Sequence, residues 1–226
     1  MTIKVVDAAA PLHARAKARA TAGRTRRDAI LDEATGLFAE RGYEGASMAH
    51  LAERVGLRKA SLFHHFASKD LLYAAVIERL LGPLGDAIQE AVLTRGSFTE
   101  RLDAMTDALT LALARQPYAA RLLLREFMDW GPVLRHTLGK RIQSVLEAAY
   151  QFARAGQEAG AFVDTDAKQV IVSLVGALFF PFAAAGVTET FIGQNPFDPR
   201  FVEERRAVVR EQVRWMVVAK KKFASK

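Results

Sequence analysis

Residues 61–70, SLFHHFASKD, bring together side chains that could do chemistry: two adjacent histidines, two serines, a lysine and an aspartate. Neighbouring histidines on a helix point in different directions, whereas paired metal ligands on a helix need a spacing of four residues. No third histidine completes a metal-ligand set, and Ser61 has none of the context of a nucleophile elbow. We therefore expect no metal site and no catalytic site. Two interpretations of this stretch remain open. It is either a surface that binds an anionic partner or a polar helix surface without a partner.

Positive charge is concentrated at the N-terminus. The 226 residues carry a net charge of +7, and residues 1–27 contain seven of the basic residues and one acid, Asp7. Such an arm either contacts nucleic acid or is a solvated tail, and both interpretations stay open. The chain has no cysteine, which excludes disulfides, thiolate catalysis and cysteine-ligated metals. The N-terminus has no apolar stretch of signal-peptide length, so we expect a cytoplasmic protein.

Apolar residues recur at spacings of three and four along the chain, and no alternating run stands out, which predicts an all-α protein. The spacing predicts short helices at 25–41, 47–55, 58–64 and 69–81, with Gly82-Pro83 interrupting the last. It predicts longer helices near 98–115, 118–130, 133–159, 166–185 and 199–222. A small N-terminal group of helices thus precedes a larger bundle.

Two short helices joined by a glycine turn, with one helix in front, have the outline of a helix-turn-helix. The stretch SMAHLAERVGLRKASLFHHF fits that outline. Ser47 is a suitable N-cap, small Ala52 lets two helices cross closely, and Gly56 can take the positive φ of a sharp turn. Leu57 and Leu62 would hold the second helix to the first. The outward set would be Arg58, Lys59, Ser61 and His64, which suits phosphates and base edges.

Residues 27–72 also follow an ordered series of short motifs. The series contains Leu37-Phe38, Gly42-Tyr43, Ser47, Ala52, Gly56, Phe63-His64-His65-Phe66 and Ser68-Lys69-Asp70. In this order and register it resembles the DNA-binding domain of the TetR family of bacterial transcriptional regulators. The rest of the chain resembles that family only in its all-helical plan and its length.

The resemblance implies DNA-binding roles. Ser47, His64, His65 and Lys69 would contact phosphates; Lys59, Ala60 and Ser61 would face base edges; Arg24, Arg26 and Arg27 would approach the backbone or a minor groove. Two positions depart from the family pattern. Phe63 stands where a tyrosine usually donates to a phosphate, so that contact should be missing. Arg58 replaces a capping Ser or Thr and adds a cation that would replace the lost contact.

The stretch VIVSLVGALFFPFAAAGV, residues 170–187, has Ser173 as its only polar residue. Its length is at the lower limit for a membrane span, so a membrane anchor, a core helix and a dimer helix are all open from the residues alone. The resemblance favours the dimer, because TetR-like proteins pair two late helices from each subunit, and we expect no membrane contact. The predicted interface is Ile171, Val175, Leu178, Phe182, Val202, Val209, Val213 and Met216.

The middle helices carry apolar and aromatic residues that line either a core or a ligand pocket. For each residue singly the core is the more common role. The family commonly binds small hydrophobic effectors at this place, so we predict a pocket lined by Met105, Leu109, Arg125, Phe127, Met128, Trp130, His136 and Phe152. Arg121, Arg125 and Arg135 would suit an anionic effector.

The resemblance divides the chain into a flexible basic arm (1–24), a helix-turn-helix DNA-binding domain (25–72) and a helical effector-binding and dimerisation domain (73–226). It implies an effector-responsive homodimer, by family habit a repressor, that binds a palindromic double-stranded DNA operator. We expect no enzyme activity and no cofactor. The alternatives are a dimeric DNA-binding structural protein without an effector, which a filled core would favour, and an enzyme or lipid carrier with an incidental helix-turn-helix.

Overall fold

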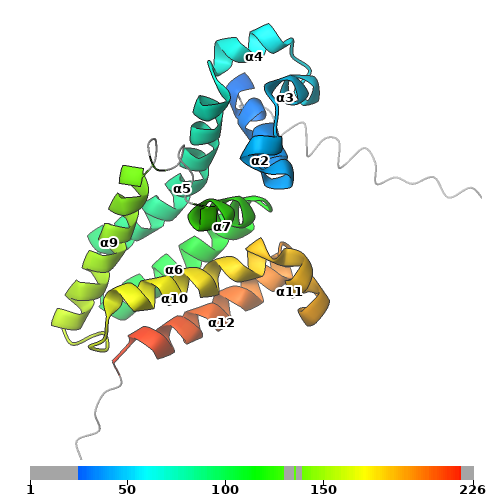
Figure 1. Cartoon of the computed structure of the whole chain (residues 1–226). Helices are drawn as coiled ribbons and strands as arrows, with labels where there is room; N and C mark the ends of the chain where they lie inside the picture. The colour runs from blue at the N-terminus through cyan, green and yellow to red at the C-terminus, as the bar shows by residue number, and fades with distance from the viewer. Residues whose placement is uncertain (1–24, 130–134, 136–138, 220–226) are drawn as a thin grey trace, which may run out of the picture.

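Helices make up the regular structure of the described part of the chain. A computed structural model describes residues 25–129, 135 and 139–219, and every regular element in these ranges is an α-helix (Figure 1). This confirms the predicted all-α class, with a small N-terminal group of helices followed by a larger bundle. The only β contact within these ranges is an isolated antiparallel bridge between Phe162 and Val218. The predicted arm, 1–24, lies outside the described residues.

The N-terminal part consists of α2 (Arg26–Gly45), α3 (Met48–Arg54), α4 (Lys59–His65) and the beginning of α5 (Lys69–Leu93). A capping box starts α2: the Thr25 side chain accepts from the Asp28 N–H, and the Asp28 carboxylate accepts from the Thr25 N–H. Gly42, with φ of 70°, interrupts the helix close to its predicted end. The chain then stays helical as far as Gly45.

The C-terminal part consists of α6 (Phe98–Ala114), α7 (Ala119–Asp129), α9 (Gly139–Glu158), α10 (Ala167–Ala183), α11 (Ala185–Ile192) and α12 (Pro199–Val217). The predicted helices match α6, α7 and α10 closely. The helix predicted at 199–222 begins with α12 but ends earlier, at Val217, and residues 220–222 lie outside the described residues. The start of the predicted helix 133–159 lies largely outside the described residues. The short α11 was not predicted, and it follows α10 across a bend of 80°. In the described ranges no single helix has the length and apolar character of a membrane span; only α10 and α11 taken together do.

The helix α5 runs without a break from the N-terminal part into the bundle, which corrects the predicted interruption at Gly82-Pro83. Pro83 lies inside α5, where it lacks the N–H that would bond the preceding turn. Packing on both sides compensates, because α5 contacts α2 along its first half and α6 and α9 along its second. The proposed boundary between residues 72 and 73 therefore falls within a continuous helix.

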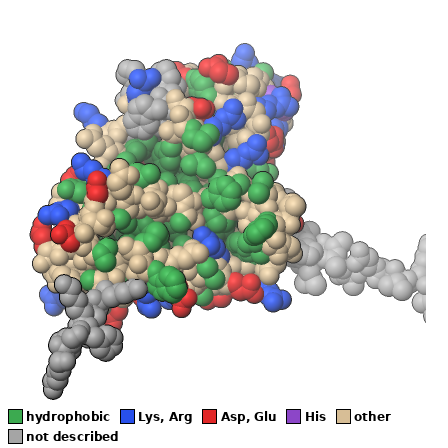
Figure 2. All heavy atoms as spheres, turned by 60° about the horizontal axis from the view of Figure 1, so that its bottom comes forward, with side chains coloured by type: hydrophobic (Ala, Val, Ile, Leu, Met, Phe, Trp, Pro, Cys, Tyr) green, Lys and Arg blue, Asp and Glu red, His purple; other side chains and the backbone are tan. Residues whose placement is uncertain are grey.

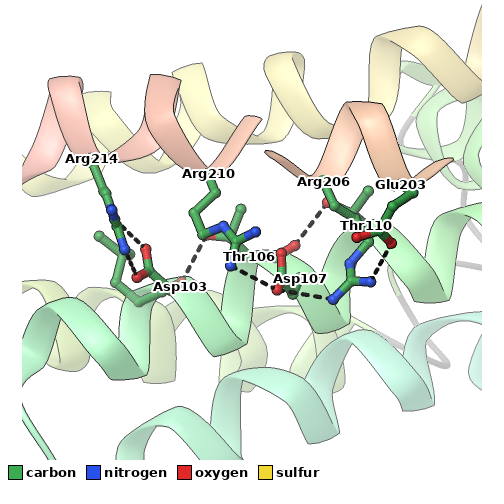
Figure 3. A network of polar contacts seen from close by, with 9 residues as sticks. Asp103, Thr106, Asp107, Thr110, Glu203, Arg206, Arg210 and Arg214 are labelled. Carbon is green, nitrogen blue, oxygen red and sulfur yellow. Dashed lines mark hydrogen bonds and ion pairs between the residues drawn. The ribbon is translucent and has the colours of Figure 1, made fainter. Parts of the chain in front are cut away.

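An ion-pair network fixes α12 to α6 (Figure 3). Asp103 and Asp107 lie one turn apart on α6 and face Arg206, Arg210 and Arg214 on α12. The Arg206 Nη2 donates to Asp107 Oδ2 at 3.0 Å, and Arg210 Nη1 lies 3.4 Å from the same oxygen. The Asp107 side chain is only 16% exposed, so solvent screens this pair less than a surface pair. The network holds one face of α12 inward and leaves the other face outward.

The face of α10 and α12 predicted to bind a second subunit is turned into the chain's own core. Five predicted interface residues are buried within the single chain: Leu178, Phe182, Val202, Val209 and Val213. Ile171 and Val175 are half-buried, and only Met216 is exposed. A side chain already buried by its own chain has no surface left for a partner, so the prediction is wrong for those five residues.

The outward face of the same two helices carries large apolar side chains. Val172 and Phe180 on α10 are 68% and 56% exposed, and Val208 and Trp215 on α12 are 48% and 84% exposed. Viewed from this side, the molecule shows hydrophobic side chains at several places across its surface (Figure 2). We call these four residues the outer apolar face. Such clustering on a surface marks an interaction site more often than chance exposure does.

Candidate nucleic-acid interface

The turn between α3 and α4 has the geometry of a helix-turn-helix. Ser47 caps α3, its hydroxyl accepting from the His50 N–H at 3.1 Å. Gly56 has φ of 64°, a conformation that costs glycine little, and the Leu57 N–H donates to Ala52 O at 2.8 Å. Ala52 is buried where the two helices approach. The predicted cap, crossing residue and turn glycine are therefore where the sequence placed them.

The helix α4 is held by its apolar side and presents its polar side. Leu62 is fully buried and Phe66, its C-cap, is 3% exposed. The N-cap residue Arg58 makes no side-chain cap bond, as its side chain has no acceptor. The remaining side chains are exposed or half-exposed: Arg58, Lys59, Ala60, Ser61, Phe63, His64 and His65. A cationic, donor-rich helix surface of this kind suits phosphates and the acceptors of a major groove.

Arg26 and Arg27 brace the motif, a role that the sequence reasoning missed. The Arg26 Nη2 donates to Val55 O, at the end of α3, at 3.0 Å. The Arg27 Nη1 donates to His65 O, at the end of α4, at 3.0 Å, and its guanidinium lies 4.1 Å from the centroid of the Phe66 ring. Cations at helix C-termini are favoured by the helix dipole. Arg26 therefore fixes the end of α3 and Arg27 fixes the end of α4. Both side chains remain exposed, so their approach to the DNA backbone or a minor groove stays a prediction; Arg24 lies outside the described residues.

The beginning of α5 forms a second polar corner beside α4. Ser68 caps this helix, because its hydroxyl accepts from the Leu71 N–H at 3.1 Å. The N-terminus of a helix favours anions, since its first N–H groups have no partner within the helix. The Lys69 Nζ lies 4.3 Å from the centroid of the Tyr43 ring and 3.4 Å from Glu44 O. The Tyr43 hydroxyl donates to the Asp70 carboxylate. Lys69 is thus positioned at the edge of the motif by α2, so any shift of α2 against α5 moves it.

The helix α7 connects this motif to the bundle (Figure 1). On one side the Arg125 guanidinium packs so closely on Gly42 of α2 that a Cβ there would lie 3.0 Å from its Nη2. Glu126 is 7% exposed and faces the buried hydroxyl of Tyr73 on α5. Among the described residues, this hydroxyl has no hydrogen-bond partner at normal geometry. On the other side Phe127 packs on Phe179 of α10. We call Arg125, Glu126, Tyr73 and Gly42 the junction.

Burial raises the pKa of two side chains in the junction, Glu126 and Tyr73. Desolvation raises the pKa of the Glu126 carboxyl above its usual value, and Asp129 raises it further, although Tyr73 and Arg125 act in the opposite direction. Desolvation and the neighbouring Glu126 raise the pKa of the Tyr73 phenol. Tyr73 also packs edge-on against Phe38 and Tyr43, with ring centroids 4.7 and 4.9 Å away. The junction therefore places a costly buried carboxyl directly against the motif's own aromatic core.

An apolar cavity of about 140 Å³ lies in the bundle below α7. Four predicted ligand-pocket residues line it: Met105, Leu109, Phe127 and Phe152. Two others do not, because Arg125 belongs to the junction and Met128 is 73% exposed. Trp130 and His136 lie outside the described residues. The sequence missed the walls supplied by α5 and α10, among them Leu84, Ile88 and Leu174, since nothing in a helical stripe tells a cavity wall from packed core.

Metal chemistry finds no support in the described ranges. They contain no group of three histidine, aspartate or glutamate side chains arranged to hold an ion. His64 and His65 are both on α4, where His64 is exposed and His65 is half-exposed.

Comparison with known proteins identifies both parts of the chain. Residues 30–76 match the model for bacterial regulatory proteins of the tetR family, and residues 99–213 match the model for a tetracyclin repressor-like C-terminal domain. The second match alone covers half of the chain.

Individual relatives are regulators rather than enzymes. The chain is 37% identical over 83 residues to the transcriptional activator FasR of Mycolicibacterium smegmatis, covering 37% of this chain and 38% of FasR. It is 31% identical over 111 residues to the transcriptional repressor AcnR of Corynebacterium diphtheriae, covering 49% of this chain and 54% of AcnR. The matched regions thus span about two fifths of FasR and about half of AcnR. The solved regulator PfmR of Thermus thermophilus superposes with a TM-score of 0.64 at 26% identity, covering 82% of this chain and 97% of PfmR.

Proposed function

Because the chain belongs to the tetR family of bacterial regulatory proteins, we propose that it is a cytoplasmic, dimeric transcriptional repressor that binds palindromic operator DNA and is released by a small hydrophobic ligand. The observation that carries the proposal is the surface of α4, where Arg58, Lys59 and Ala60 stand exposed on a helix that Leu62 and Phe66 hold rigidly. The repressor part of the proposal is supported by relatives such as AcnR, which is a transcriptional repressor.

Base reading rests on the first half of α4. Lys59, Ala60 and Ser61 form the first turn of α4, so the N-terminal end of the helix would bring a cation, a methyl group and a hydroxyl to one groove. Phosphate contacts would come from Ser47, His64, His65 and Lys69 around them. Arg58 lies at the N-cap with its side chain exposed and without a cap bond, which leaves its charge available for the DNA backbone.

The outer apolar face supports dimerisation. Val172 and Phe180 are separated by two turns on α10, with Gly176 between them, where a Cβ would meet nothing within 4 Å. Val208 and Trp215 are likewise two turns apart on α12. Two adjacent helices with one apolar stripe each form half of a four-helix interface, and a two-fold axis makes that surface complementary to itself. A dimer of this kind holds two α4 helices at a fixed separation.

The cavity and the junction support release by a ligand. A filled core would favour a DNA-binding protein without an effector, and the bundle instead contains a cavity against Phe127 of α7. The neighbouring residue, Glu126, faces Tyr73, and Tyr73 packs on Tyr43, beside which Lys69 lies. A ligand that displaces Phe127 therefore moves α7 against α2 and α5. It weakens DNA binding to the extent that it prefers the displaced state.

Selection of DNA from a random double-stranded pool by the purified full chain tests the proposal. The expected product is an inverted repeat whose half-sites lie about one or two helical turns apart, because two copies of α4 read successive faces of the duplex. Recovery of no enriched sequence, or of a single unrepeated site, would contradict a dimeric operator-binding regulator. A Lys59→Ala variant run in parallel is expected to enrich a less defined half-site.

A further inference from the structure

The cavity offers a ligand nothing but hydrocarbon. Thr106 is the only polar residue among the described residues that line it, and its hydroxyl already donates to Leu102 O at 2.8 Å. A polar group placed inside would lose its hydrogen bonds to water without replacement. The enclosed part of any ligand is therefore aliphatic or aromatic.

The size of the cavity limits that apolar part. At about 140 Å³ it is close to an engineered cavity of about 150 Å³ that binds benzene. About six carbon atoms therefore fit without movement of the walls. A short aliphatic chain meets this limit, whereas a rigid system of several fused rings does not.

A polar cleft adjoins the cavity between α9 and α10. The cleft has a volume of about 740 Å³, and three side chains line both spaces: Ile142, Leu146 and Ile171. Leu146 is 47% exposed, so the cavity reaches the surface at this point. A ligand whose tail lies inside thus continues directly into the cleft.

Positive charge predominates in the cleft. Arg135, Lys140 and Lys168 line it, with Glu147 as the only acid among its described walls. No ion pair within the described ranges holds Lys140 or Lys168, whereas Glu147 accepts a hydrogen bond from the Gln151 amide at 2.6 Å. The Lys168 Nζ lies 5.4 Å from the centroid of the Tyr150 ring, which directs it over the cleft wall. An apolar cavity thus opens into a cationic exit.

We propose that the effector is an anionic amphiphile: a single aliphatic chain of about six to eight carbons that ends in a carboxylate or in a phosphate-bearing thioester. The tail occupies the cavity and the anionic end lies among Arg135, Lys140 and Lys168. This inference rests on the proposed function, because it names the chemical class of the ligand that would release the DNA. The shared requirement is negative charge at the end of a short chain.

Calorimetry with three probes of one chain length tests the inference on the full chain: octanoate, octanoyl-coenzyme A and 1-octanol. At least one anionic probe is expected to bind about tenfold tighter than the alcohol, since exposed ion pairs each contribute only a few-fold. The preference should shrink at high salt. Tighter binding of the thioester than of octanoate assigns the charge to phosphates, and the reverse order assigns it to a free carboxylate.

Two variants locate the binding groups. Lys140→Ala with Lys168→Ala is expected to weaken binding of the preferred anion about fivefold and to leave 1-octanol unchanged. The matched control is Arg115→Ala with Arg200→Ala, which removes two exposed cations that do not line the cleft and should change neither affinity. Ala149→Trp, which fills the cavity, should abolish binding of all three probes.

Equal affinity for 1-octanol and both anions would overturn the inference, as would a double lysine variant that behaves like its control. The operator assay separates this failure from failure of the proposed function. Release of DNA by 1-octanol with no anion preference would leave the effector-responsive regulator standing and reject the ligand class. Failure of all three probes to bind a protein that binds its operator would reject the ligand class and leave the operator-binding regulator standing.

Discussion

The α3–α4 unit and the α10–α12 layer bury apolar residues in different ways. In α3–α4, Leu51 and Leu62 face one small core, and the outward surface is polar apart from Ala60 and Phe63. In α10–α12, apolar residues lie on both sides: Phe182 and Val209 face the core, and Phe180 and Trp215 face solvent. The first unit is complete as a folded surface and presents polar groups to an anionic partner. The second has an apolar surface that only another apolar surface can cover.

Helix α7 packs against α10 on one side and, on the other, against α2 and α5, the helices that flank the α3–α4 unit in the chain. It places Phe127 against the cavity, Glu126 against Tyr73 and Arg125 against Gly42. A buried carboxyl on the path between a cavity and a DNA-binding motif is costly in stability. Such a cost is more typical of a functional contact than of a packed core. The comparison therefore predicts that variants in the outer layer, the bundle core and the junction affect different measurements.

The largest effect is expected on the outer apolar face. Trp215→Glu places two like charges at a two-fold interface and should weaken self-association by at least about 100-fold, as loss of a central aromatic anchor does. The stability of the single chain should hardly change, since the Trp215 side chain is 84% exposed. Analytical ultracentrifugation over a concentration series measures the dissociation constant.

Val209→Ala is the matched control for this prediction. Val209 is fully buried on the opposite face of α12, so its truncation should lower the free energy of unfolding by about 1–2 kcal/mol and leave the dissociation constant unchanged. Weaker association in Val209→Ala and unchanged association in Trp215→Glu would restore the interface predicted from the apolar stripe.

The next largest effect is expected at Gly156 in α9. A Cβ at this position would lie 2.1 Å from the Phe162 ring, which also packs against Phe98 and Phe152. Gly156→Ala should therefore lower the free energy of unfolding by about 2–3 kcal/mol, measured by urea denaturation. Gly56→Ala should cost only about 1 kcal/mol, because Gly56 has φ of 64° with nothing within 4 Å. Equal costs would mean that the Phe162 ring moves aside without loss.

A smaller effect is expected in the α6–α12 network. Asp107→Ala leaves Arg206 and Arg210 without their shared partner and should lower the free energy of unfolding by about 2 kcal/mol, a value between surface and buried pairs. Glu204→Ala removes the exposed pair with Arg200 and should cost less than about 0.5 kcal/mol. Thermal denaturation of both variants checks the contrast. A cost for Asp107→Ala as small as that for Glu204→Ala would show that the network of Figure 3 contributes no more than a surface pair.

The smallest and most specific effect is expected from Glu126→Gln. A carboxyl whose pKa is raised above 4.5 on folding binds its proton more tightly in the folded chain, so stability falls as pH rises through that window. Glutamine cannot ionise and removes this loss. The free energy of unfolding of Glu126→Gln, relative to the natural chain, should therefore increase between about pH 4 and about pH 7 in urea titrations. A constant difference across that range would show that Glu126 carries no raised pKa.

The motif was predictable because its contacts are local. Ser47, Ala52, Gly56 and Leu62 lie within sixteen positions of one another, and each performs the task that its chemistry suggests. The braces at Arg26 and Arg27 escaped prediction because their acceptors are backbone carbonyls 29 and 38 residues away. Any arginine can donate to any carbonyl, so residue type gives no signal for such a pair.

The helices of the bundle could be predicted from the sequence, but which of their faces lie inward and which lie outward could not. The stripe through Leu178, Phe182 and Val209 indicated correctly that these residues are buried and gave no information on what buries them. The outer face was missed because α10 is apolar on nearly every side, which removes the contrast that a stripe requires. The ion pairs of Asp107 with Arg206 and Arg210 span about a hundred positions and appear only when α12 lies on α6.

Competition binding to the selected operator and to unrelated DNA, at several salt concentrations, tests the central claim that α4 reads the operator. We predict salt-dependent binding and a preference for the operator that falls by about tenfold or more in Lys59→Ala. Arg200→Ala, an exposed cation on α12, should keep the full preference. An unchanged preference in Lys59→Ala, or operator binding that is insensitive to salt, would contradict the assignment of α4 as the recognition helix.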